Sequence, residues 1–151
     1  MGRVLTRSEV LSLIPQQEPF RFVDEITELS DERVAGTYRW RPDADFYRGH
    51  FPGNPITPGV LLIECMAQCT VVPLAVYLFH RDYEKDAEKL QTIFTDAAVD
   101  FGDLVRPGER VRTEATLVFW RRKKLKVQAE MRRADGTLVC SGTLAGIGVV
   151  P

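Results

Sequence analysis

Alternation of apolar and polar residues along much of the chain predicts a β-sheet. Residues 109–121 place apolar side chains nearly on one face, and residues 125–131 repeat this pattern after a basic turn. Asp135-Gly136 is typical of a hairpin turn. Together with strand-forming residues elsewhere, these patterns predict strands over residues 20–29, 33–40, 109–121, 125–131 and 137–150, and a further strand within 90–101.

Two segments show helical patterns instead. Residues 6–14 predict a short amphipathic helix that ends before Pro15, with Thr6 and Glu9 spaced as a capping box. Residues 59–79 form a much longer apolar run, 21 residues without a basic side chain. Between the helices and strands, we expect an ordered loop over 41–58 and a surface connection over 81–89.

The long apolar segment has two interpretations. At about 1.5 Å per residue it would extend about 31 Å, enough to cross a bilayer. Glu64, Gln68 and Pro73 interrupt it, and a carboxylate is costly inside a membrane. We therefore predict a buried core helix and no membrane insertion, with Pro73 kinking its last turns. An antiparallel sheet wrapped around this helix would make the protein a single α+β domain over 1–151.

Composition excludes several other classes of protein. The 151 residues are 44% hydrophobic and 27% charged with a net charge of −1, which argues against a disordered chain and against a nucleic-acid partner. The cysteines and histidines (Cys65, Cys69, Cys140, His50 and His80) are too scattered for a zinc site, and none calls for a disulfide. We see no signal peptide and expect a cytoplasmic location.

Most of the candidate catalytic residues lie in residues 49–68, which have the sequence G-H-F-P-G-N-P-I-T-P-G-V-L-L-I-E-C-M-A-Q. Prolines at every third position stiffen the loop that holds His50. Gly59 begins the long helix, where backbone amides have no intrahelical acceptor and suit an oxyanion. Glu64 and Gln68 lie one turn apart on that helix. Each residue alone has an ordinary structural explanation, but together they predict an acid–base site beside an apolar wall.

This segment closely resembles the signature of the β-hydroxyacyl–acyl-carrier-protein dehydratases of bacterial fatty-acid synthesis. The resemblance covers most of the chain and includes P-F-R-F-V-D at 19–24, the whole of 49–68, R-P-G-E at 106–109 and D-G-T-L-V at 135–139. It implies a hotdog fold, in which a curved antiparallel sheet wraps around one long buried central helix. A related branch of the family, whose members also isomerise the product, has aspartate at the position of Glu64. The glutamate here therefore indicates the branch that only dehydrates.

The resemblance also implies a role for each site residue. His50 would remove the α-proton of a (3R)-hydroxyacyl thioester, and Glu64 would protonate the departing β-hydroxyl. The backbone amide of Gly59 would polarise the thioester carbonyl, and Gln68 would orient Glu64. No metal or other cofactor is implied, because the substrate is carried on the phosphopantetheine of acyl carrier protein. In this family the His and Glu of one site come from different subunits, which implies an obligate homodimer, often assembled into a trimer of dimers.

Two pairs of residues depart from the family pattern. Gln16 and Gln17 stand where the family has a basic pair, and Gly102 and Asp103 stand where basic residues are common. Both changes leave the His50/Glu64 chemistry intact but leave the acyl chain and pathway open, including a specialised lipid or polyene pathway.

Charge is unevenly distributed along the chain. Residues 106–133 contain ten basic and three acidic residues, so the rest of the chain is acidic. The strongest basic run is Arg121-Arg122-Lys123-Lys124. It is either a solvated hairpin turn or a docking patch for an acidic acyl carrier protein.

Two other functions remain open from the sequence. A hotdog thioesterase would hydrolyse the same thioester, although the H-F-P-G loop argues against it. A non-catalytic acyl-binding protein is disfavoured by the intact His50/Glu64 pair. Cys65, Met66 and Cys69 flank the site, and core packing explains them better than an acyl tunnel does.

Overall fold

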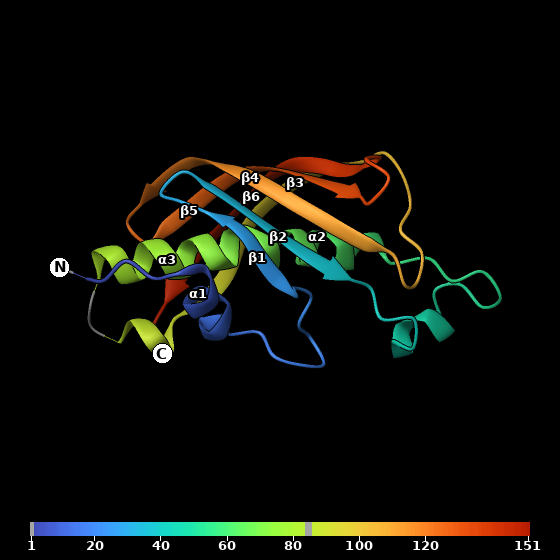
Figure 1. Ribbon diagram of the computed structural model, residues 1–151, viewed down its shortest axis with the longest axis horizontal. Helices are drawn as coiled ribbons and strands as arrows, with labels where there is room; N and C mark the ends of the chain where they lie inside the picture. The colour runs from blue at the N-terminus through green and yellow to red at the C-terminus, as the bar shows by residue number, and fades with distance from the viewer. Residues whose placement is uncertain (1, 84–85) are drawn as a thin grey trace.

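The structure, a computed structural model, describes residues 2–83 and 86–151. One six-stranded antiparallel sheet has the strand order β1-β2-β4-β5-β6-β3 (Figure 1). Its strands are β1 (Glu25–Leu29), β2 (Arg33–Arg39), β3 (Gln91–Phe101), β4 (Arg110–Arg121), β5 (Lys124–Arg133) and β6 (Leu138–Val149). The helices are α1 (Arg7–Leu13), α2 (Gly59–Cys69) and α3 (Val71–Asp82). The predicted hotdog architecture is confirmed.

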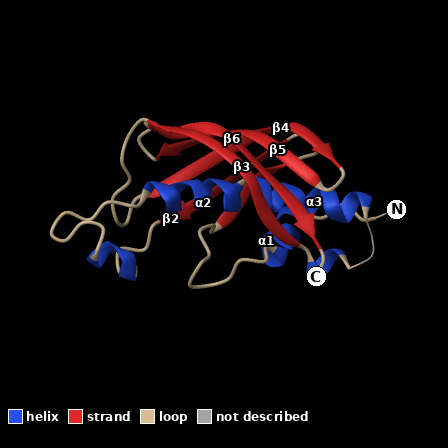
Figure 2. Cartoon of the chain, turned by 180° about the vertical axis from the view of Figure 1, so that it is seen from behind, coloured by secondary structure: helices blue, strands red, loops and turns tan. Residues whose placement is uncertain are grey.

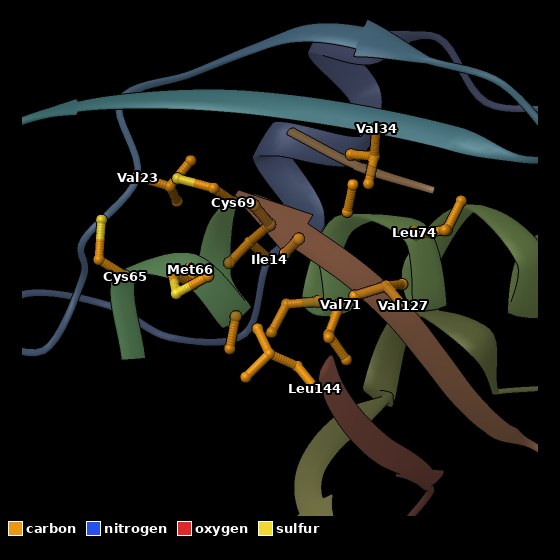
Figure 3. Packing of buried hydrophobic residues seen from close by; sticks show 14 of the residues in the cluster. Ile14, Val23, Val34, Cys65, Met66, Cys69, Val71, Leu74, Val127 and Leu144 are labelled. Atoms are coloured by element: carbon orange, nitrogen blue, oxygen red, sulfur yellow. The ribbon is translucent and has the colours of Figure 1, made fainter. Parts of the chain in front are cut away.

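The sheet covers α2 and α3, which run end to end beneath it, and α1 lies on their other side (Figures 1 and 2). The helical stretch Gly59–Asp82 is 24 residues long, and 72% of its most apolar window is buried inside the protein. The core-helix interpretation of this stretch is therefore confirmed. Figure 3 shows Met66, Val71, Val127 and Leu144 gathered between the helices and the strands.

The central helix is interrupted at Thr70, whose φ of −132° and ψ of −72° are not helical. Pro73, three residues later, has no N–H to donate to the Cys69 carbonyl, and its ring crowds that carbonyl. The Thr70 N–H donates to the Ala67 carbonyl at 3.2 Å, and the Thr70 hydroxyl donates in its place to the Met66 carbonyl at 2.6 Å. The predicted kink in the last turns is wrong: Pro73 lies in the first turn of α3, where proline is tolerated, and the break precedes it.

At the first edge of the sheet, β1 is short and covered. The capping box of α1 is confirmed, with Thr6 Oγ1 accepting from Glu9 N at 3.2 Å. From α1, Arg7 Nη1 donates to the carbonyl of Thr27 at 2.6 Å, where the β1–β2 register shifts between Ile26 and Glu28. Side-chain cover, a bulge and shortness are standard ways of blocking an edge strand.

The opposite edge, β3, is long and bare. It spans 11 residues, nearly all of them exposed, and Ile93 and Phe94 are 49% and 42% exposed. An exposed apolar edge strand of this length is a surface on which another strand can pair.

The connecting segments follow the predictions with one correction. The loop 41–58 is ordered and includes a 3₁₀ turn at Asp45–Arg48. The connection 81–89 contains the end of α3 and a turn at Ala87–Lys89, while residues 84–85 lie outside the described residues. The strand predicted over 20–29 begins only at Glu25, because the chain before it is held by a side chain of α2.

Candidate active site

That side chain is Gln68, which is fully buried and makes three hydrogen bonds. Its Oε1 accepts from the backbone N–H of Phe22 at 2.6 Å. Its Nε2 donates to the carbonyl of Phe20 at 3.0 Å and to Glu64 Oε2 at 2.8 Å. Because a backbone N–H only donates and a carbonyl only accepts, these partners fix which way the amide points. Gln68 therefore ties the loop before β1 to the carboxyl of Glu64.

Glu64 is half-buried on α2, one turn before Gln68. Burial raises the pKa of this carboxyl, and the hydrogen bond from Gln68 opposes the rise in part. The Gln68 amide occupies Oε2, so a proton on Glu64 resides on Oε1. A carboxyl whose pKa is raised by burial, and whose proton lies on the oxygen away from Gln68, is suited to act as a general acid.

His50 lies in the loop that follows the 3₁₀ turn and is partly buried. Its Nδ1 lies 2.8 Å from the carbonyl oxygen of Ile56. Since a carbonyl only accepts, the neutral ring carries its proton on Nδ1 and leaves the lone pair on Nε2. The Ile56 amide in turn donates to the His50 carbonyl at 3.0 Å, which closes the loop. This histidine is thus held in the tautomer that accepts a proton at Nε2.

Gly59 is the first residue of α2. A Cβ at this position would lie 3.2 Å from the ring of Phe101 at the end of β3. Glycine therefore lets the ring approach the start of the helix. Amides in the first turn of a helix are without intrahelical acceptors and form the positive end of the helix dipole. The position fits stabilisation of an oxyanion.

A pocket that opens to solvent lies at Glu64, between the central helix and the β3–β6 pair. Ala67, Val71 and Val72 form its helical wall, and the remaining lining residues are Gln16, Thr92, Ile93, Phe94 and Gly146. Gly146 matters here because a Cβ there would lie 3.2 Å from Val71 Cγ1. Sequence reasoning missed these wall residues, although the departure at Gln16 had drawn attention to that position.

Within one chain, the structure brings together only some of the sequence-predicted residues in the Glu64 pocket. Glu64 and Gln68 are in contact, whereas His50 is not among the residues that line the Glu64 pocket. Cys65, Met66 and Cys69 are all fully buried in the core, which confirms the core-packing interpretation. Across residues 2–83 and 86–151, no three His, Cys, Asp or Glu residues are grouped so as to hold a metal ion.

The basic run lies at the tip of the β4–β5 hairpin. Arg122 and Lys123 have φ of 53° and 65°, as in a tight two-residue turn. Lys123 Nζ lies 5.2 Å from the ring centre of Tyr83, just after α3. The hairpin is therefore at the α3 end of the central helix, whereas Gly59 and the His50 loop are at the α2 end (Figure 1).

Comparison with known proteins identifies relatives over nearly the whole chain. Residues 14–144 match the family model of the FabA-like domain. A 3-hydroxyacyl-[acyl-carrier-protein] dehydratase FabZ of Chloroflexus aggregans is 37% identical over 142 residues, covering 93% of this chain and 94% of the relative. The FabZ dehydratase of Lactobacillus helveticus is 34% identical over 145 residues, covering 95% and 93%.

Solved structures share the fold at much lower identity. The dehydratase heterocomplex ApeI:P from Xenorhabdus doucetiae has a TM-score of 0.76 at 18% identity, covering 97% of this chain and 93% of that one. The thioesterase HI1161 of Haemophilus influenzae has a TM-score of 0.69 at 15% identity, covering 99% and 94%. Because dehydratase and thioesterase share this fold, the likeness to these structures does not separate the two activities.

Proposed function

The chain belongs to the FabA-like domain family and is a FabZ-type 3-hydroxyacyl-[acyl-carrier-protein] dehydratase of fatty acid biosynthesis, and we propose that His50 and Glu64 are its base and acid. His50 Nε2 takes the proton from the carbon next to the thioester carbonyl. The negative charge that develops on the carbonyl oxygen is stabilised by the Gly59 amide. Glu64 gives its proton to the β-hydroxyl, the C–O bond breaks, and water leaves with the trans-2-enoyl thioester.

The observation that carries this assignment is the Glu64–Gln68 pair at the pocket. Gln68 binds one oxygen of Glu64 and burial favours the protonated carboxyl. The carbonyl of Ile56 supports the complementary role of His50, because it keeps the lone pair on Nε2. Both groups are thus prepared for their roles before substrate binds.

We further propose that the active enzyme is a homodimer formed across β3, acting in the cytoplasm, with a trimer of dimers as a larger assembly. A two-fold pair of identical edge strands is necessarily antiparallel. Such a pair sets the α2 end of one copy beside the α3 end of the other. This accounts for the separation of His50 from the Glu64 pocket within one chain, because each site would take its histidine from the neighbouring copy.

The assay of hydration separates the proposed activity from hydrolysis. An enoyl thioester is incubated with the protein while enoyl absorbance and free thiol are followed together. We expect reversible loss of enoyl absorbance without thiol release, whereas thiol release would indicate a thioesterase. His50→Ala and Glu64→Gln should each lower the rate by roughly 10²-fold or more.

His80→Ala is the matched control for this experiment. His80 Nδ1 also lies near a backbone carbonyl, that of Val76 at 2.9 Å, but it is on α3 and does not line the pocket. Its substitution should leave the hydration rate unchanged. Full activity in either site variant would refute the assignment of that residue.

We also propose that Arg121, Arg122, Lys123 and Lys124 dock acyl carrier protein. In the proposed dimer this basic hairpin approaches the Gly59 end of the neighbouring copy, and basic surfaces attract an acidic carrier. Reversing the charge of Arg121 and Arg122 should raise KM for carrier-linked substrate and leave KM for a pantetheine thioester nearly unchanged. Equal effects on both substrates would contradict docking at this hairpin.

A further inference from the structure

The wall of the Glu64 pocket contains one polar pair, Gln16 and Thr92. Gln16 Nε2 lies 3.4 Å from Thr92 Oγ1, a long hydrogen bond. Gln16 Oε1 is buried, and no donor reaches it from the described residues, 2–83 and 86–151. Turning the amide over would bring Oε1 to the threonine hydroxyl and leave the NH₂ group without a partner. In either orientation, the wall holds one unsatisfied polar group.

Contacts along β3 place this pair at the far end of the pocket. Phe101 lies against Gly59 at the start of α2, and Gly146, which pairs with Phe94, lies against Val71. β3 therefore runs antiparallel to the central helix, and Thr92 lies beyond Val71. Glu64 comes before Val71 on the helix, so a substrate with its β-carbon at Glu64 extends its acyl tail toward Gln16.

We propose that Gln16, with Thr92, contacts the end of the acyl chain and determines which chains bind well. A tail that carries a hydroxyl at this point is favoured over an alkyl tail of the same length. This rests on the proposed function only for the direction in which the substrate lies. A methyl group beside Gln16 leaves the polar group unsatisfied, at a cost comparable to a lost hydrogen bond. A hydroxyl both donates and accepts, so it satisfies the amide in either orientation.

The proposed selectivity for the end of the acyl chain belongs to the side chain at position 16. Its neighbour Gln17 turns away, and its Nε2 donates to the carbonyl of Ile14 at 3.0 Å. Gln17 does not line the pocket. The two glutamines are therefore a matched pair, one in the acyl wall and one outside it.

Binding is measured by calorimetry with saturated acyl pantetheine amides of increasing length, each also made with a terminal hydroxyl. In these probes an amide replaces the thioester, so no reaction occurs. For the wild-type protein, we expect affinity to increase about fourfold with each added CH₂ and to stop increasing when the tail reaches Gln16. At that length the hydroxyl-bearing probe should bind about tenfold more tightly than the alkyl probe.

Gln16→Met replaces the amide with an apolar chain of similar length. It should abolish the preference for the hydroxyl and allow the next longer alkyl probe to bind more tightly, while Gln17→Met keeps the wild-type profile. Thr92→Val should weaken the preference in the same direction and provides a second variant if Gln16→Met does not fold. An identical length profile in wild type and folded variants would overturn the proposal. Hydration of a short enoyl thioester tests the proposed function separately.

Discussion

At Glu64, burial and a single hydrogen bond act on one carboxyl in opposite directions. Burial raises its pKa and the bond from Gln68 lowers it, with burial the larger effect. The pKa of Glu64 is therefore raised while the carboxyl keeps the orientation that Gln68 gives it. Because these two effects change the pKa of Glu64, they should influence the pH dependence of protein stability as well as that of activity.

Stability should show the raised pKa of Glu64. The folded chain holds more protons than the unfolded chain at pH values between the ordinary carboxyl pKa of 4.5 and the raised one. The contribution of Glu64 to the free energy of unfolding therefore falls as pH rises through this interval. Glu64→Gln removes this contribution, so the variant should gain stability relative to wild type with rising pH. Urea unfolding across a pH series measures the difference, and parallel profiles would contradict it.

Gln68→Leu should affect both stability and acidity. It leaves the Phe22 N–H and the Phe20 carbonyl without their partner, at about 1–3 kcal/mol for each group left unsatisfied. It also removes the bond that lowers the pKa of Glu64, so the loss of hydration activity at high pH should move to higher pH. Gln128→Leu, on the exposed face of β5, is the control. An unmoved pH profile would show that Gln68 acts only in packing.

Between elements, the contact of β2 with the end of α2 depends on one glycine. A Cβ at Gly36 would lie 3.0 Å from the Cβ of Cys69 and 3.2 Å from its carbonyl oxygen. The backbone of the helix end cannot yield as a flexible side chain can. Gly36 therefore sets how closely the central helix approaches the sheet.

Gly36→Ala should destabilise the protein by about 1–3 kcal/mol, as expected for overpacking. Gly49→Ala is the matched control, because a Cβ there meets nothing closer than 3.9 Å. Chemical denaturation of the two variants compares them. If Gly36→Ala is as stable as Gly49→Ala, the helix end moves without cost and the contact is not a constraint.

Local patterns predicted most of the elements from the sequence. Alternation predicted β4 and β5, the Asp135-Gly136 turn predicted β6, and the spacing of Thr6 and Glu9 predicted the cap of α1, because each depends on residues close in the chain. The segment 20–24 has strand-like residues but forms no strand. Gln68, 46 residues from Phe22, takes the Phe22 N–H, and no local pattern contains that contact.

The candidate site, too, could be predicted only where its contacts join residues that are close in the chain. Glu64 and Gln68 are one turn apart, so their contact follows from helical spacing. The pairing of Gln16 with Thr92 joins residues 76 positions apart and could not be predicted. The family resemblance implied a site shared between subunits. The spacing of His50 and Glu64 did not show that His50 lies outside the Glu64 pocket, because it allowed them to fold together within one chain.

At the scale of the whole molecule, the proposed sharing of sites can be tested by mixing two inactive variants. His50→Ala and Glu64→Gln homodimers would each lack one half of every site. If subunits exchange, half of the dimers become mixed and each mixed dimer has one intact site. Hydration activity should then return to about a quarter of the wild-type value. No recovery, with exchange verified by mass-labelled subunits, would place both residues of a site in one chain.

The two edges of the sheet also determine how far such association can proceed. Arg7 and a bulge cover β1, while β3 is bare. A sheet with one blocked edge and one open edge can be extended once, by a second copy, and the combined sheet then ends in two blocked edges. In the proposed dimer, growth into filaments by strand addition would thereby be blocked, and the exposed apolar strand would form a closed pair without becoming a template for aggregation.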